Sequence, residues 1–209
     1  MRLHAIVDVD ASTRAGLIPL EVARAFLHGG ARFLQLRAKT LGSRAFLELA
    51  DACVALARAS SASIIINDRI DIARVSRADG VHVGQDDVPP AAARQLLGDK
   101  AIVGLSTHTL AQVDAALREP ISYLAVGPVF GTGSKETGYE AVGLTLVSAA
   151  ARLAGKVPVV AIGSITIENA SSVLEAGAAS VAVISDLLAG GQPEQRTRAF
   201  MRTLMDNRV

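Results

Sequence analysis

Acidic side chains follow two neighbouring apolar runs of this chain. Asp68 comes after residues 64–66 and Asp87 after residues 80–83. Fully apolar runs are typical of buried parallel strands, and adjacent strands lie about 4.8 Å apart. Both carboxylates could therefore bind one cation, and hard oxygen ligands beside a phosphate suit Mg2+. The alternative is that one of the two acids only caps the following turn or helix.

Basic side chains follow the preceding apolar run. Gln35, Arg37 and Lys39 alternate along an extended segment, so they share one side of it. A guanidinium offers a planar fork to phosphate oxygens, and an ammonium adds a compact charge. We expect Arg37 and Lys39 to bind phosphate. The alternative is a solvated loop that carries two surface cations.

A second anion site is predicted near the end of the chain, in AIGSI (161–165) and VIS (183–185). The loops after the last two strands of barrels often bind phosphate through backbone N–H groups. Gly163 allows an oxygen to approach the backbone, and Ser185 adds a hydroxyl.

The loop Gly131-Thr132-Gly133-Ser134-Lys135 carries two hydroxyls and one ammonium. These groups could hold a carboxylate or a phosphate, and the glycines favour a mobile lid over an ordinary loop. The sequence shows no Ser-His-Asp or Cys-His grouping and no CxxC or HExxH motif. The site is therefore predicted to bind anions and stabilise charge. His4, His28 and His82 are expected to be structural, and His108 to contact an anion.

The elements that must position these residues alternate along the chain. Apolar runs predict strands at 3–7, 33–36, 63–66, 80–83, 101–105, 123–126, 157–161 and 180–183. Helical periodicity covers 20–28, 43–58, 90–97, 109–117, 144–153 and 167–176, and Pro193 opens a last helix. Residues 71–75 are expected to form a single helical turn.

Eight strand–helix units favour an α/β protein with one (β/α)8 TIM barrel, forming a single catalytic domain over residues 1–209. The competing architecture is an open doubly wound sheet. However, no G-x-G-x-x-G follows the first strand, and polar clusters follow at least six strands. An open sheet would concentrate such clusters near one crevice.

Composition excludes several classes of protein. Half of the residues are hydrophobic but only 3% are aromatic, so the core must consist of Ala, Val, Leu and Ile. The formal charge of +1 argues against nucleic-acid and membrane partners. The single cysteine, Cys53, is expected to be a buried thiol in a reducing compartment. Without a recognisable signal segment, we expect a cytoplasmic protein. A homodimer is compatible with a small barrel, although no interface can be located.

Several segments occur in the order found in one known family. They are LHAIVD at the start, QLRAK (35–39), INDR (66–69), ADGVHVGQDD (78–87), GLSTH (104–108), GPVFGTGSK (127–135), VVAIGSI (159–165) and VAVIS (181–185). In these segments the chain resembles the thiamine phosphate synthase (thiamine-phosphate pyrophosphorylase) family, to which thiazole tautomerase is related. The resemblance covers almost the entire chain.

The resemblance implies a role for each matching residue. Asp68 and Asp87 would bind Mg2+, and Arg37, Lys39, Ser106 and Lys135 would be catalytic. The pyrimidine diphosphate would contact Gln35, Leu36, Arg37, Ala38, Lys39, Asn67, Ser106 and Lys135. The thiazole phosphate would contact Thr132, Gly133, Ser134, Gly163, Ile184 and Ser185.

Two positions depart from the family pattern. Ser164 replaces the second glycine of a pair, and Ser134 replaces the second threonine of T-x-T-K. We expect both roles to persist, because serine keeps the hydroxyl at residue 134 and the backbone N–H at residue 164.

The implied reaction joins 4-amino-2-methyl-5-hydroxymethylpyrimidine diphosphate to thiazole phosphate and releases pyrophosphate. One alternative is the thiazole tautomerase branch, which tends to lose the second metal carboxylate and to carry histidine where this chain has Pro128. Asp87 and Pro128 therefore favour the synthase. Another alternative is a non-catalytic barrel that binds a phosphorylated ligand. The chain carries both the basic residues and the acidic residues of the predicted site, which argues against a non-catalytic barrel.

Overall fold

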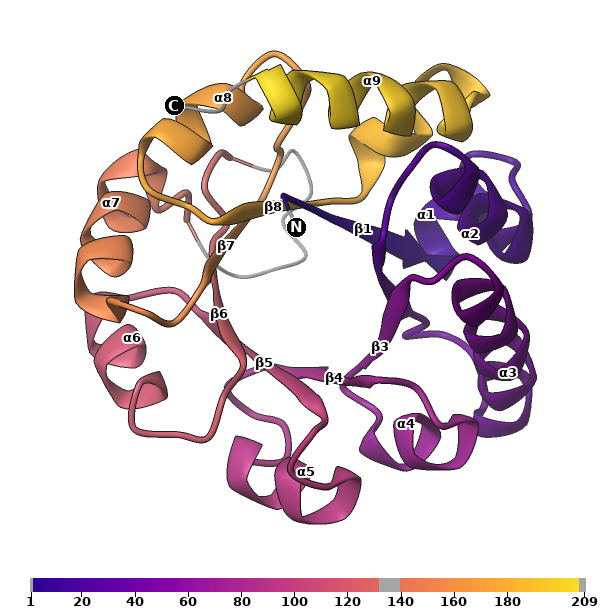
Figure 1. Ribbon diagram of the computed structural model, residues 1–209, viewed down its shortest axis with the longest axis horizontal. Coiled ribbons are helices and arrows are strands. Elements are labelled where there is room, and N and C mark those ends of the chain that lie inside the picture. Colours follow the sequence, from indigo (N-terminus) through magenta and orange to yellow (C-terminus); the bar gives the residue numbers. More distant parts are fainter. Residues whose placement is uncertain (1, 132–139, 207–209) are drawn as a thin grey trace.

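The computed structural model describes residues 2–131 and 140–206. Its eight strands form a closed parallel barrel in sequence order, in which β1 pairs with both β2 and β8 (Figure 1). The strands are β1 (Leu3–Asp8), β2 (Phe33–Arg37), β3 (Ser63–Asn67), β4 (Gly80–Val83), β5 (Ile102–Thr107), β6 (Tyr123–Val126), β7 (Val159–Ile162) and β8 (Ser180–Val183). The predicted TIM barrel is confirmed.

Helices surround the barrel on its outside (Figure 1). They are α1 (Val9–Arg14), α2 (Pro19–His28), α3 (Ser43–Ala59), α4 (Ile70–Ser76), α5 (Pro90–Leu97), α6 (Leu110–Ala116), α7 (Gly143–Ala154), α8 (Ala170–Glu175), the 3-10 helix η2 (Ser185–Gly191) and α9 (Pro193–Asp206). The sequence pattern did not predict α1 or η2. The segment expected to be one turn is the longer helix α4, and α8 begins three residues later than expected.

Strand alternation divides the apolar side chains between two cores. Outward-facing residues pack against the helices, in a cluster that includes buried Leu34, Leu36 and Ile66. Inward-facing residues fill the barrel with a smaller cluster: Ile6, Phe33, Ile65, Tyr123, Ala125, Val160 and Ala182. Because side chains alternate along a strand, Gln35 and Asn67 share the inward face with Phe33 and Ile65. The barrel lumen is thus packed and carries polar groups.

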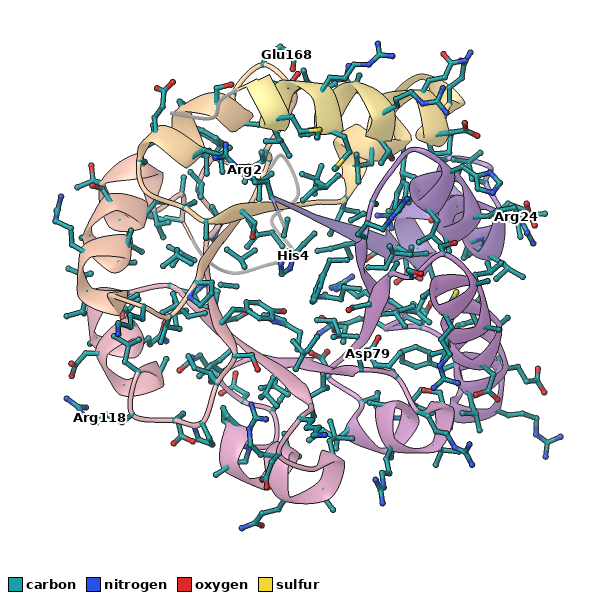
Figure 2. The ribbon with its side chains drawn as sticks, viewed as in Figure 1. Arg2, His4, Arg24, Asp79, Arg118 and Glu168 are labelled. Atoms are coloured by element: carbon teal, nitrogen blue, oxygen red, sulfur yellow. The ribbon has the colours of Figure 1, made fainter. Side chains whose placement is uncertain are left out.

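Two side chains expected to be structural lie in these cores. His4 lies inside the ring of strands (Figure 2) and stacks on Phe33 with ring centroids 4.1 Å apart. Burial, and to a lesser extent the His82 imidazole, lowers the pKa of His4 to about 3. Cys53 is buried in α3, and burial raises the pKa of its thiol to about 12. Within residues 2–131 and 140–206, no helix is long and apolar enough to span a bilayer.

Candidate active site at the carboxyl ends of the strands

An ion pair joins the ends of the first two strands. Asp8 and Arg37 are register partners of β1 and β2, and Arg37 Nη1 donates to Asp8 Oδ2. Asp8 Oδ1 also accepts from the backbone N–H of Ala11 at 2.8 Å, which caps the start of α1. Because Asp8 is buried, it holds the Arg37 guanidinium in a fixed position. A guanidinium has five N–H donors, so the remaining donors of Arg37 can face the mouth of the barrel. Sequence reasoning did not single out Asp8, although an acid that ends an apolar strand was a visible signal.

A second ion pair joins the ends of β2 and β3. Lys39 Nζ lies 3.1 Å from Asp68 Oδ2, and more than half of the lysine side chain is exposed. The backbone N–H of Asp68 donates to the carbonyl of His82 at 2.8 Å, which extends the β3–β4 pairing by one residue. Asp68 adopts a positive φ of 62°, a conformation that aspartate tolerates better than most residues. The structure therefore brings these two predicted residues together.

The Asp87 carboxylate lies close to Asp68. Burial raises the pKa of Asp68; Lys39 opposes that rise, and the adjacent Asp87 carboxylate adds to it. Asp87 Oδ2 also accepts from the backbone N–H of Gly84 at 2.7 Å. Asp87 therefore does cap a turn, as the alternative supposed. Its carboxylate nevertheless lies beside Asp68 at the rim of the barrel.

The two carboxylates match the ligand chemistry of magnesium. Among the described residues, no group of three or more His, Cys, Asp or Glu side chains could hold a metal ion. A cation at Asp68 and Asp87 would therefore draw its remaining ligands from water or a substrate. Mg2+ is commonly bound in this way, by one or two carboxylates, several waters and phosphate oxygens.

Buried polar side chains lie below these charges inside the barrel. Gln35, Asn67 and His82 are all less than a tenth exposed. His82 Nε2 lies 2.8 Å from Ser106 Oγ. Ser106 also accepts at its backbone carbonyl from Gln85 Nε2, at 2.6 Å. Thus Ser106 is held both by its side chain and by its backbone.

The predicted monophosphate loops lie after β7 and β8. Gly163 has φ 115°, and a Cβ there would lie 2.5 Å from the Cα of Pro128. This close approach requires glycine. Ile184 packs against the inner barrel cluster, and Ser185 is the exposed first residue of η2.

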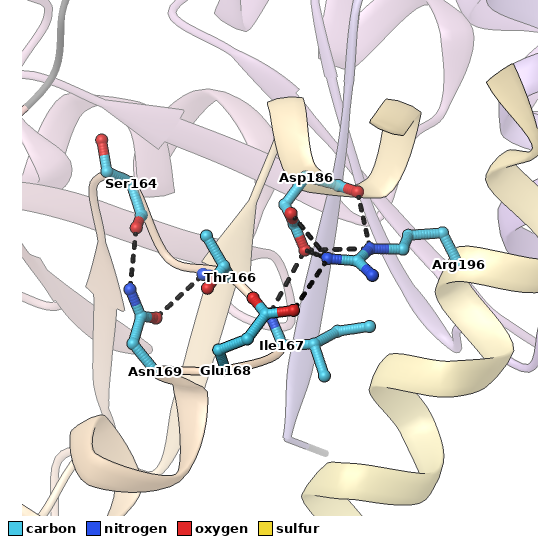
Figure 3. A network of polar contacts seen from close by, with 7 residues as sticks. All are labelled: Ser164, Thr166, Ile167, Glu168, Asn169, Asp186 and Arg196. Carbon is cyan, nitrogen blue, oxygen red and sulfur yellow. Dashed lines mark hydrogen bonds and ion pairs between the residues drawn. The ribbon is translucent and has the colours of Figure 1, made fainter. Parts of the chain in front are cut away.

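The departure at Ser164 is accommodated by the backbone. Ser164 adopts a left-handed φ of 47°, and its Oγ donates to the carbonyl of Gly131 at 3.0 Å. The carbonyl of Ser164 accepts from Asn169 Nδ2 at 3.1 Å, and Asn169 Oδ1 accepts from the N–H of Thr166 at 2.8 Å (Figure 3). Serine therefore retains the local conformation that the family's glycine would adopt easily.

An ion pair lies behind the same two loops. Arg196 Nη2 donates to both carboxylate oxygens of Asp186, at 2.8 Å each (Figure 3). Asp186 Oδ2 also accepts from the N–H of Ile167 at 3.2 Å, and Arg196 lies 3.6 Å from Glu168. Helix α9 is thereby tied to the loops after β7 and β8. Sequence reasoning missed this network because its members lie in three separate segments: the loop after β7, the start of η2 and helix α9.

The remaining predicted residues are placed as follows. Leu36 and Ala38 are buried in the core between barrel and helices, so only their backbone could contact a ligand at the mouth. His108 Nδ1 forms a hydrogen bond with the carbonyl of Gly127 at 2.6 Å. Thr132, Gly133, Ser134 and Lys135 lie outside the described residues.

Comparison with known proteins identifies the family. A family model described as thiamine monophosphate synthase matches residues 3–187. The chain belongs to this family. It is similar to the thiamine-phosphate synthase of Roseiflexus castenholzii, with 43% identity over 95% of this chain and 86% of that protein. It is also 43% identical to the thiamine-phosphate synthase of Chlorobium luteolum, over 99% of this chain and 94% of the relative.

A solved structure supports membership of the thiamine monophosphate synthase family. The thiamine phosphate pyrophosphorylase from Pyrococcus furiosus superposes with a TM-score of 0.89 and 29% identity, covering 100% of this chain and 97% of that one. A structure described as native KDPGal has a TM-score of 0.72 at 18% identity, which shows the barrel fold alone. The chain is therefore an enzyme of the thiamine monophosphate synthase family, as the sequence resemblance implied.

Proposed function

We propose that this chain condenses 4-amino-2-methyl-5-hydroxymethylpyrimidine diphosphate with thiazole phosphate, forming thiamine phosphate and pyrophosphate. Its relatives of similar length are named thiamine-phosphate synthases. The observation that carries the proposal is the meeting of Lys39, Asp68 and Asp87 at one rim, with Arg37 anchored beside them. Such a mixture of cations and carboxylates suits a diphosphate together with a divalent metal.

Asp68 and Asp87 would hold Mg2+ in this proposal. When bound, the metal would supply positive charge to the oxygens of the departing diphosphate. The raised pKa of Asp68 supports this assignment, because burial and a neighbouring carboxylate both disfavour its charged form when no cation is present.

Arg37 and Lys39 would bind the diphosphate and neutralise the charge that grows on it as the C–O bond breaks. Asp8 holds the Arg37 guanidinium in place, so the cation needs little reorganisation when the substrate binds. Lys135, which lies outside the described residues, is proposed to add a third cation to the same leaving group.

The pyrimidine ring would lie over the inward-facing polar residues Gln35, Asn67 and Ser106. Loss of diphosphate leaves a pyrimidine methyl cation, which the electron-rich aminopyrimidine ring stabilises. The thiazole nitrogen already carries a lone pair, so no protein base is needed to activate it. The main task of the protein is then to hold the nitrogen against the cationic carbon.

The thiazole phosphate would lie on the other side of the mouth. Gly163, Ile184 and Ser185 would surround its phosphate, with Thr132, Gly133 and Ser134 around the rest of the substrate. The close approach of Gly163 to Pro128 and the bracing of both loops by Asp186 support this placement. The substrates are therefore two small phosphorylated molecules.

A two-substrate assay tests the proposed function against its alternatives. We expect purified protein to release pyrophosphate only when both substrates and Mg2+ are present. Isomerisation of the thiazole without pyrophosphate release would instead indicate a tautomerase. Binding of a phosphorylated ligand with neither reaction would indicate a non-catalytic barrel.

A further inference from the structure

A chain of hydrogen bonds crosses the interior of the barrel. Tyr123 on β6 places its hydroxyl 2.8 Å from His82 Nδ1 on β4, and His82 Nε2 lies 2.8 Å from Ser106 Oγ on β5. The Gln35 side chain on β2 also hydrogen-bonds to the Tyr123 hydroxyl. Four strands thus contribute one connected polar network, which ends at Gln35 and at Ser106. In the proposed function, both of these residues contact the pyrimidine ring.

The barrel is built to accommodate this network. A Cβ at Gly104 would lie 2.1 Å from Tyr123 Cζ and 2.6 Å from His82 Nδ1, so glycine leaves the space in which the two side chains meet. The Tyr123 and His82 rings are stacked, with centroids 5.6 Å apart and planes 16° apart. His4 and Phe33 pack edge-on against Tyr123 at 5.1 and 6.3 Å. Both rings are therefore fixed.

The hydrogen-bond capacity of imidazole limits the direction of the network. A neutral imidazole has one donor and one acceptor nitrogen, so His82 accepts from one of its two neighbours only when it donates to the other. Burial raises the pKa of Tyr123, which therefore keeps its proton, and the Gln35 amide opposes that rise as a hydrogen-bond donor. In the direction that uses the Tyr123 proton, Tyr123 donates to Nδ1, and the Nε2–H of His82 donates to Ser106 Oγ.

We propose that Tyr123 and His82 are positioning residues that leave the Ser106 hydroxyl free to donate, and the Gln35 carbonyl free to accept, toward the bound heterocycle. The inference rests on the proposed function, since it assigns Ser106 and Gln35 to the pyrimidine ring. Reversal of the Tyr123–His82 hydrogen bond would require reversal of the His82–Ser106 bond, because a neutral imidazole has only one N–H. The hydroxyls of Tyr123 and Ser106 are therefore coupled, and the ring must present an acceptor to Ser106.

Histidine tautomers can be measured without substrate. In protein labelled with 15N-histidine, we expect the ring nitrogens of His82 to show the Nε2–H tautomer near pH 7. His4, which is also buried and neutral, is the internal reference. A His82 ring that is protonated at Nδ1, or at both nitrogens, would overturn the inference. This result does not depend on turnover, so it is separate from a failure of the two-substrate assay, which would instead contradict the proposed function.

Kinetics separate positioning from simple packing. Tyr123→Phe keeps the ring and removes the hydroxyl, so it should raise KM for the pyrimidine diphosphate roughly three- to tenfold, with kcat and the thiazole KM within about twofold. Phe33→Leu alters the same cluster without touching a hydrogen bond. It should lower Tm with no selective change in the pyrimidine KM. An unchanged pyrimidine KM in Tyr123→Phe, or an equal rise in both KM values, would overturn the inference.

A conservative replacement provides the final control. Glutamine at residue 82 can both accept from Tyr123 and donate to Ser106, whereas leucine can do neither. We therefore expect His82→Gln to bind the pyrimidine diphosphate at least threefold more tightly than His82→Leu. Equal impairment of the two variants at matched folding, judged by circular dichroism, would show that residue 82 acts only by filling space.

Discussion

Arg196 and Asp186 form an ion pair in which Arg196 Nη2 lies 2.8 Å from each of the two carboxylate oxygens of Asp186. The pair joins α9 to the first turn of η2, directly beside Ser185. The same carboxylate accepts from the backbone of Ile167, beyond β7. The two loops proposed to hold a monophosphate therefore share one support outside the barrel.

Arg196→Gln should weaken this support. The Asp186 side chain is largely buried, so loss of its cation should lower the free energy of unfolding by about 1–3 kcal/mol. It should also raise KM for thiazole phosphate more than KM for the pyrimidine diphosphate. Steady-state kinetics and thermal unfolding measure the two effects. Arg198→Gln, which breaks an exposed pair with Glu194 on the same helix, is the control and should change neither. Equal effects in both variants would show that the support is not specific.

Asp87→Asn should impair the metal site and largely spare the fold. Asparagine still accepts the hydrogen bond from Gly84 through its amide oxygen, but it lacks the charge that attracts Mg2+. We expect turnover to fall at least tenfold and to require more Mg2+, while Tm changes by less than about 3 °C. Asp86→Asn, at the adjacent exposed acid, is the matched control. A fall in Tm that accounts for the lost activity would support the capping alternative instead.

Stability should depend on pH through buried His4. Its folded pKa of about 3 lies below the ordinary value of 6.5, so the unfolded chain binds a proton that the folded chain excludes. Its neutral form contributes fully to stability above about pH 6.5, and this contribution is lost as pH falls. His4→Leu should therefore reduce the slope of unfolding free energy between pH 6 and pH 4 by up to about 1.4 kcal/mol per pH unit.

Urea unfolding at several pH values measures that slope. An identical pH dependence in wild-type protein and His4→Leu would contradict the pKa assigned to His4.

Adjacent residues in the loop after β7 should differ in their tolerance of substitution. Gly163→Ala places a Cβ against Pro128 at a φ that disfavours side chains, so it should cost about 1–3 kcal/mol and raise KM for thiazole phosphate. Ser164→Gly relaxes a left-handed serine and should leave activity within about twofold. Tm and thiazole KM of both variants test this contrast. A harmless Gly163→Ala would show that the loop is not held as the structure indicates.

The barrel could be predicted because its strands are nearly continuous apolar runs. For β4, β6 and β8 the predicted bounds agree with the structure: polar or glycine residues flank the runs of β4 and β6, and the polar Ser180 begins that of β8. Helix α1 was missed because its sequence VDASTR is polar and has weak helix propensity; it depends on the Asp8 cap. Tertiary contacts, rather than local pattern, specify that helix.

The site was only partly visible in the sequence. Lys39, Asp68 and Asp87 were predictable because the ends of neighbouring strands meet at one rim. The partner of His82 was not, because Tyr123 lies two strands away on β6 and the two rings meet only on the inside of the barrel. The expectation that His82 is purely structural therefore omitted its bond to Ser106. The Asp186–Arg196 pair was hidden because no local sequence pattern links an acid at the start of η2 to a base on α9.

The most direct measurement of the central claim is the stoichiometry of the two products. With both substrates and Mg2+, we predict one pyrophosphate released for each thiamine phosphate formed, and no pyrophosphate when thiazole phosphate is omitted or the metal is chelated. Asp68→Asn should reduce both products together. Pyrophosphate release that continues without thiazole phosphate at the same rate, or a complete reaction mixture that yields no thiamine phosphate, would contradict the account.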